Sequence, residues 1–386
     1  MAGLKVFIFH MWYYYLLAIG FSSLYFDFRR KRLLTPRWLR CYCFFTNGVL
    51  LLTLPFYCRN GMVYLDAFIE KPLLVIAGRF NVVMQSFVIL YTLTMRHHHD
   101  QRYYGIAQRL LRLEWIYFEK WLEAPKLSYD RLFYLKLFTL FFQNITLVLG
   151  CVTILEKRSL TWDDYLLNVY FFIIWNTLYS ITLTYFLTLL HIVRRYDVLN
   201  IYLQRRLRWL NAAPHDSSVQ ITDAWLSELR RLLDVHEQLQ TIVVQTNNLY
   251  RSHITAMLLI FFLSSTVTFY LAFMNLAKWS TKQLYIITSF LLFALKSFDV
   301  FLTNHCCEIL VARHSEALSL LKRHQHRLHC TNFSLNVALS RFTINIYGMF
   351  NLNHRATLAV LRNAVMHALI LIQFDYIVDP EKRHEN

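Results

Sequence analysis

Seven long apolar segments constrain the fold of this chain more than any other feature. Each contains about 20 residues or more, which is the length a helix needs to cross the hydrocarbon core of a bilayer. Hydrophobic residues make up 56% of the chain, too many for an ordinary soluble protein of 386 residues. The pattern therefore predicts an all-α, polytopic protein of the lipid bilayer. The predicted spans are 39–57, 73–95, 132–155, 165–193, 254–274, 284–305 and 357–376.

An eighth apolar stretch, Val6–Phe26, precedes these spans and is followed by the basic run Arg29–Arg32. No small-residue cleavage site follows it, so we do not expect a cleaved signal peptide. The pattern favours an interfacial or partly inserted helix over a full span.

Lys and Arg alternate between the connections, and this alternation predicts the topology. The leader and the second, fourth and sixth connections are rich in both residues. The other three connections hold one pair each: Arg59 and Lys71, Lys157 and Arg158, Lys278 and Lys282. Basic loops stay in the cytoplasm, so we expect the N-terminus inside and the C-terminus outside. That orientation opposes a G-protein-coupled receptor, and the net charge of +16 indicates inner loops rather than a nucleic-acid partner.

The connections on the inner side carry helical patterns of their own. Apolar residues recur at spacings of three and four in 195–210 and 222–248, with a predicted break at 211–218. We therefore expect the helices to extend into a cytoplasmic bundle. The expected organisation is a cytoplasmic N-terminal segment with an interfacial helix (1–38), spans one to four (39–193), a cytoplasmic helical connection (194–253), spans five and six (254–305), a cytoplasmic anchor region (306–356), and a pore-lining seventh span with an extracellular tail (357–386).

The last span has one polar stripe. Asn363, His367, Ile370 and Phe374 recur at spacings of four, three and four, and Gln373 lies beside the last of them. Polar groups within a span are costly and usually face a protein interior or a water-filled path. A hydrogen bond to a neighbouring helix would account for any one of them. The stripe as a whole favours a pore-lining helix.

Other polar residues in and near the spans suggest no catalytic site. We expect Lys296 to pair with Asp299 inside the sixth span, and Lys136 to reach the membrane interface. The run Arg96–Asp100 (RHHHD) is interpreted as a solvated basic loop rather than a histidine box of a metal enzyme. The seven cysteines have no metal-site or disulfide spacing and are expected to be buried thiols. We therefore predict no metal, no cofactor and no enzyme activity.

The C-terminal residues resemble a known signature. Gly348-Met349-Phe350-x-Leu352, followed by a span that ends in Gln373-Phe374, is similar to the end of insect gustatory receptors. In that family a Gly-Leu-Phe-like turn precedes a last helix with Thr-Tyr, five apolar residues and Gln-Phe. Here residues 368–372 are the five, and Met366-His367 replaces Thr-Tyr. Cys306-Cys307-Glu308 and Glu316 also resemble the end of the family's sixth span.

The resemblance implies a ligand-gated, non-selective cation channel in the plasma membrane of sensory dendrites, without a G protein. The channel would be a homotetramer or a hetero-oligomer with other gustatory receptors, opened by a small-molecule tastant. Gln373 and Phe374 would form the gate near the outer mouth. Ala368 stands where sugar-sensing members tend to have Glu, which favours a bitter or other non-sugar ligand. An odorant-receptor-like subunit and a non-channel membrane receptor or enzyme are the alternatives.

Two further predictions concern the cation path and the ligand. Four copies of Phe374 could close a hydrophobic constriction, and four copies of Asp375 could form an anionic ring outside it. A solvated tail is the alternative for Asp375. The ligand pocket is implied to lie among the earlier spans. Their outward halves offer candidate ligand-binding residues that the sequence does not rank: Gln143, Asn144, Tyr170, Trp175 and Tyr270.

Overall fold

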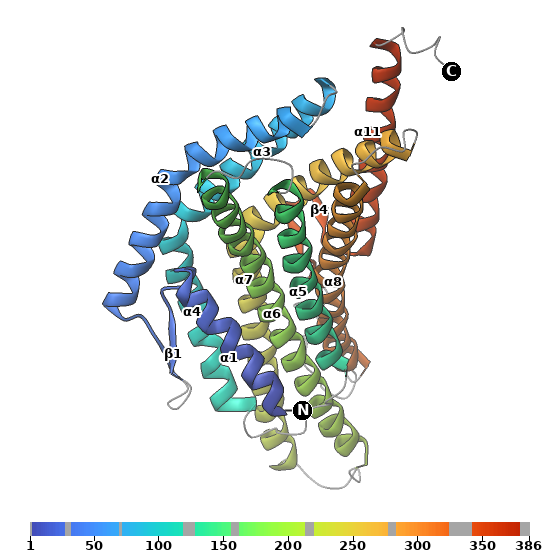
Figure 1. Cartoon of the computed structure of the whole chain (residues 1–386). Helices are drawn as coiled ribbons and strands as arrows, with labels where there is room; N and C mark the ends of the chain where they lie inside the picture. The colour runs from blue at the N-terminus through green and yellow to red at the C-terminus, as the bar shows by residue number, and fades with distance from the viewer. Residues whose placement is uncertain are drawn as a thin grey trace.

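The structure of the chain is a computed structural model, which describes residues 2–27, 32–68, 72–118, 128–155, 162–212, 220–276, 283–323 and 342–378. Nearly all of these residues are helical (Figure 1). The helices are α1 (Ala2–Ala18), α2 (Arg37–Phe68), α3 (Pro72–Thr94), α4 (Arg96–Leu113) with a π-helical turn (Glu114–Phe118), α5 (Ser128–Leu155), α6 (Trp162–Ala212), α7 (Gln220–Leu276), α8 (Gln283–Arg323) and α11 (His354–Val378).

All seven predicted spans are confirmed as helices. Within the described residues, seven helices are long and apolar enough to cross a membrane, and they are α2, α3, α5, α6, α7, α8 and α11. Helix α6 is the central one, because Tyr185, Phe186 and Leu189 on it are fully buried. Large apolar side chains on the outer helices are exposed instead, among them Phe44 on α2 and Phe141 on α5, as expected for surfaces that face lipid.

Three helices are much longer than a bilayer is thick. Helices α6, α7 and α8 contain 51, 57 and 41 residues. At about 1.5 Å per residue they extend well over 50 Å, against about 30 Å of hydrocarbon. The prediction that the helices continue beyond the membrane is therefore confirmed. The break predicted at 211–218 falls between α6 and α7, and most of it lies outside the described residues.

The first apolar stretch is a shorter helix than its composition indicates. Helix α1 ends at Ala18, two residues before Gly20, which has a φ of +66°. A Cβ on Gly20 would lie 2.8 Å from Cβ of Thr46, so only glycine allows the chain to approach α2 this closely. An antiparallel hairpin follows, with strands β1 (Tyr25–Asp27) and β2 (Arg32–Leu34). Because Leu16 joins the main hydrophobic core, α1 is part of the folded bundle.

A second hairpin leads into the last helix. Strands β3 (Asn345–Ile346) and β4 (Phe350–Asn351) pair antiparallel around Tyr347 and Gly348, whose φ angles are 50° and 73°. The turn predicted at Gly348 and Phe350 is therefore present, although the Phe350 side chain lies outside the described part of the structure. Asn247 of α7 donates a hydrogen bond of 2.9 Å to the Asn345 carbonyl, which fixes the hairpin against the bundle.

The two ends of the fold lie far apart. The start of α1 and the last turns of α11 are at opposite ends of the bundle (Figure 1), as an odd number of spans requires. Which end faces the cytoplasm stays a prediction from the basic connections.

Candidate functional site

Helix α11 has one buried face and one exposed face. Thr357, Ala364, Ala368 and Ile372 are at most 5% exposed and pack against neighbouring helices, mainly α7 and α8. These residues are spaced by seven, four and four, so they lie on one side of the helix. The stripe predicted from the sequence lies elsewhere on the helix and is exposed throughout: Asn363, His367, Ile370, Gln373 and Phe374.

Few contacts within the chain hold this exposed stripe. The Nδ1–H of His367 donates a hydrogen bond of 2.7 Å to the carbonyl of Asn363, one turn earlier. The same imidazole ring lies edge-on to Phe262 of α7, with 5.3 Å between ring centroids. Phe374 is 55% exposed at the far end of the helix. The Asp375 side chain lies outside the described residues, so the anionic ring expected from four copies of Asp375 stays a prediction.

A buried ion pair joins α5 to α8. The Nζ of Lys136 lies 2.7 Å from the Asp299 carboxylate and donates a hydrogen bond of 2.9 Å to Thr303. Two sequence predictions are therefore wrong. Lys136 is 1% exposed and does not reach an interface, and Asp299 pairs with Lys136 rather than with Lys296.

Lys296 lies instead against a predicted ligand-binding residue. Its Nζ is 4.0 Å from the centroid of the Trp175 ring on α6, and the indole N–H of Trp175 is buried without a hydrogen-bond partner among the described residues. Gln143 of α5 is 1% exposed, and both polar atoms of its amide lack a partner in the same part of the structure. Leu140 and Leu147, on the same face of α5, pack in the hydrophobic cluster that contains Trp175. Gln143 thus lies on the face of α5 that packs in the cluster of Trp175, and Trp175 meets Lys296 between α6 and α8.

The other three predicted ligand-binding residues make contacts within the chain, and their role in ligand binding stays a prediction. Tyr170 donates a hydrogen bond of 2.9 Å to the carbonyl of Leu50, which joins α6 to α2. Asn144 donates one of 3.0 Å to Leu140 of its own helix. Tyr270 is 1% exposed and packs with Ala368 and Ile372, so it supports α11.

A cavity of about 330 Å³ lies between α1, α4, α6 and α7, in a region that the sequence did not single out. One wall is the run Arg96–Asp100, which was predicted to be a solvated loop. That prediction is wrong: the run begins α4, and Arg96 and Asp100 are buried. Asp100 accepts hydrogen bonds of 2.9 and 2.6 Å from the backbone N–H and the hydroxyl of Ser23. Burial lowers the pKa of His99 to about 3, so this histidine is neutral at physiological pH.

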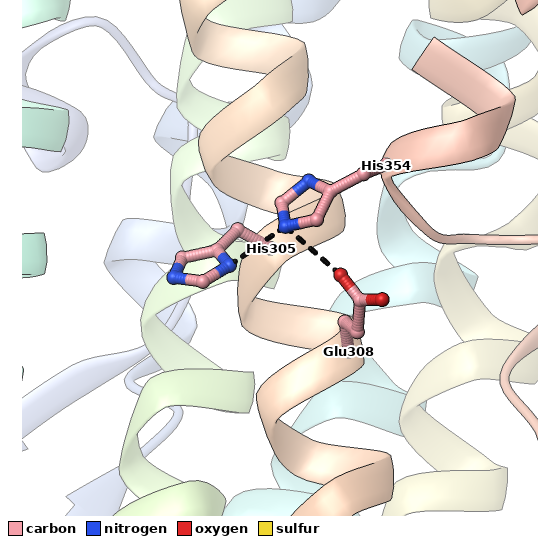
Figure 2. A group of neighbouring side chains, drawn as sticks. All are labelled: His305, Glu308 and His354. Carbon is pink, nitrogen blue, oxygen red and sulfur yellow. Dashed lines mark hydrogen bonds and ion pairs between the residues drawn. The ribbon is translucent and has the colours of Figure 1, made fainter. Parts of the chain in front are cut away.

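Three potential metal ligands meet where α8 crosses the start of α11 (Figure 2). The Nε2 atom of His354 lies 3.0 Å from Nδ1 of His305 and 2.9 Å from Oε2 of Glu308. His305 and Glu308 are one turn apart on α8, a spacing visible in the sequence, whereas the position of His354 depends on the fold. Within the described residues this is the group whose chemistry suits a metal ion.

Similarity to known proteins covers almost the whole chain. A family model described as 7tm Chemosensory receptor matches residues 9–378. Putative gustatory receptor 10b of Drosophila melanogaster is 24% identical over 388 residues, which cover 95% of this chain and 96% of that relative. Putative gustatory receptor 59b of Drosophila erecta is 21% identical over 250 residues, and this match covers 64% of the chain but only 41% of that relative's length.

A solved structure has the same fold. The insect olfactory receptor OR5 from Machilis hrabei matches with a TM-score of 0.59 and 13% sequence identity, over 95% of this chain and 99% of that chain.

Proposed function

This chain belongs to the 7tm chemosensory receptor family, and on that premise we propose that it is a gustatory receptor that works as a tetrameric, ligand-gated, non-selective cation channel. It is a multi-pass protein of the plasma membrane, with seven membrane-spanning helices. In this proposal a small non-sugar tastant opens the channel directly, without a G protein. Four copies of α11, from one kind of chain or from several gustatory receptors, line the cation path.

The exposed stripe of α11 carries the proposal. Asn363, His367 and Gln373 are exposed on a helix that is long and apolar enough to span a bilayer. Polar side chains that face hydrocarbon are costly, so this stripe needs water or other protein beside it. Copies of α11 around a water-filled path supply both. The opposite face already packs within the chain, which leaves the stripe free to face the path.

The gate follows from the chemistry at the end of the stripe. Four Phe374 rings that meet at the axis would exclude water and therefore block ions. A rotation of α11 would exchange Phe374 for the neighbouring amide of Gln373 and let water enter. Asp375 of each subunit would lie at the same mouth, where four carboxylates would concentrate cations.

The ligand site in this proposal is the junction of Gln143, Trp175 and Lys296. A buried amide with two unpartnered polar atoms is unfavourable unless a bound molecule completes its hydrogen bonds. The ring of Trp175 offers an apolar contact, and the nearby ammonium of Lys296 favours ligands with a carbonyl or an acidic group. A small, partly aromatic molecule with hydrogen-bonding groups fits this set.

Gln143→Leu tests the ligand site. The substitution removes both unpartnered amide atoms, so we expect a more stable protein, by about 1–2 kcal/mol, that needs at least tenfold more tastant for half-maximal current. Gln85→Leu is the matched control, because Gln85 is also buried but lies 3.5 Å from the Tyr57 hydroxyl on a different pair of helices. If the tastant response of Gln143→Leu equals that of the unchanged chain, the ligand site is elsewhere.

The channel itself is tested by electrical recording. Cells that express the chain, alone and together with other gustatory receptors, should show an inward cation current when a panel of bitter and other tastants is applied. The current should persist when a non-hydrolysable GDP analogue inside the cell blocks G-protein activation. Purified receptor should give the native mass of a tetramer. A current abolished by the GDP analogue, or a monomeric mass, would contradict the proposal.

A further inference from the structure

In the group of His305, Glu308 and His354, more lone pairs than hydrogens meet around one nitrogen, Nε2 of His354. A ring nitrogen carries either one hydrogen or one lone pair, yet Nε2 of His354 faces two partners, at 3.0 and 2.9 Å. If it donates to Glu308, Nδ1 of His305 can only be a second acceptor of the same hydrogen. If it accepts from His305, its lone pair faces those of the carboxylate.

The second nitrogen of His354 makes the problem sharper. Its Nδ1 atom is buried and has no hydrogen-bond partner among the described residues. An extra proton on this ring would therefore leave a buried N–H donor unpaired, which is costly. A cation between the three ligand atoms would accept the lone pairs that meet at Nε2, whereas Nδ1 of His354 would carry the hydrogen and stay without a partner among the described residues.

We propose that His305, Glu308 and His354 bind one Zn²⁺ ion. Two imidazole nitrogens and one carboxylate oxygen, with a fourth position open to water, form a set of ligands that zinc accepts. In a tetrahedral site with bonds of about 2.0–2.2 Å, neighbouring ligand atoms lie about 3.3–3.5 Å apart. The observed 3.0 and 2.9 Å contacts need to lengthen by only a few tenths of an ångström. Imidazole ligands disfavour Ca²⁺ and Mg²⁺, which prefer oxygen.

The surroundings hold the ligands in place. Phe301 stacks on the His354 ring, with 4.5 Å between centroids, and the two imidazole rings stack at 4.9 Å. Asn304, the residue before His305, donates a buried hydrogen bond of 2.7 Å to Thr357, one turn after His354, and this bond joins α8 to α11. The ligands are therefore ordered before the ion arrives, and less conformational entropy is lost when it binds.

The ion also has a route and a charge partner. The Glu308 side chain is 49% exposed and that of His354 is 31% exposed, so both can be reached from solvent. The Glu308 carboxylate is the negative charge in the group, and it offsets the partial positive charge at the N-terminus of α11. A bound ion would link α8 directly to the first residue of α11.

Zinc titration of the purified full-length chain tests the site independently of any channel activity. The chelator-treated protein should bind one Zn²⁺ per chain and unfold at a higher temperature with zinc. Glu308→Gln and His305→Gln should each bind at least about tenfold more weakly, and His354→Gln more weakly still. Co²⁺ in place of zinc should give the intense visible bands of a tetrahedral site in the unchanged chain alone.

Controls separate this site from adventitious binding. His98→Gln and Glu237→Gln replace exposed residues on α4 and α7, and both should bind zinc as tightly as the unchanged chain. The unfolding temperature of each ligand variant without metal shows whether that variant still folds. If one of the three does not fold, the zinc affinities of the other two test the site. Equal zinc affinity in all folded ligand variants, or loss of binding in His98→Gln, would overturn the proposal.

Discussion

Truncation of Phe374 should produce a channel that conducts without tastant. Phe374 is 55% exposed, and a Phe side chain has about 200 Å² of surface, so about 110 Å² per subunit is available for contact in a closed gate. At about 25 cal/mol per Å², full coverage of that area would favour the closed state by about 2.8 kcal/mol per subunit.

In the proposed tetramer, four copies of Phe374 make the effect large even when the contact covers only part of this area. If closure covers a quarter of that area, the gain is about 0.7 kcal/mol per subunit and about 2.8 kcal/mol for the tetramer. Loss of this contribution in Phe374→Ala changes the ratio of open to closed channels by about a hundredfold. The assay is whole-cell recording of the cation current without tastant, normalised to receptor at the cell surface.

A matched truncation separates the gate from a general loss of apolar surface. Phe44→Ala removes a side chain that is 80% exposed on α2, far from the exposed stripe of α11, and its basal current should match that of the unchanged chain. Phe374→Ala receptors that stay closed without tastant and open at the same tastant concentration would refute the gate.

Asp375→Lys should lower the single-channel conductance for cations, since it replaces four carboxylates at the mouth with four ammonium groups; unchanged conductance would dismiss the anionic ring. Lys136→Met leaves the Asp299 carboxylate buried without its cation and should cost about 3–5 kcal/mol, seen as a lower unfolding temperature. Adding Asp299→Leu should recover most of that loss, and a double variant as unstable as the single one would contradict this account. The pKa of His99 is lowered from its ordinary 6.5 to about 3, by burial first and then by His253, Arg96 and His98. Between pH 3 and pH 6.5, His99 binds a proton in the unfolded chain but not in the folded one. The free energy of unfolding should therefore be highest above pH 6.5 and fall as the pH is lowered towards 3, with a slope of up to about 1.4 kcal/mol per pH unit. His99→Gln should flatten that slope in thermal unfolding, whereas replacement of the exposed His97, His97→Gln, should not.

The sequence was most informative where the membrane limits the choices. A run of about 20 apolar residues has almost no stable alternative to a spanning helix, so all seven spans were predictable. The long extensions of the helices beyond the spans were predictable too, because apolar residues recur at helical spacing in 195–210 and 222–248. The hairpin before α11 was indicated by Gly348, which has the positive φ that the turn requires.

The predictions failed where the outcome depended on which face of a helix meets a neighbour. Lys136 seemed near enough to the end of its span to reach the interface, but its side of α5 packs on α8, where Asp299 neutralises it. The run Arg96–Asp100 has the composition of a solvent-exposed loop. The segment after α1 nevertheless packs on it, with Phe21 against Arg96 and Ser23 against Asp100, and so buries both ends of the run. The meeting of His354 with His305 joins two separate helices, and no local pattern reports such a contact.

The alanines on the buried side of α11 have a mechanical consequence. Large interlocking side chains would hold a helix in one rotational setting, but Ala364 and Ala368 present a nearly smooth surface to the helices behind them. A small turn of α11 about its own axis therefore breaks few van der Waals contacts, and the energy needed for it is low. In the proposed receptor, little of the binding energy of a tastant is then required to turn the helix.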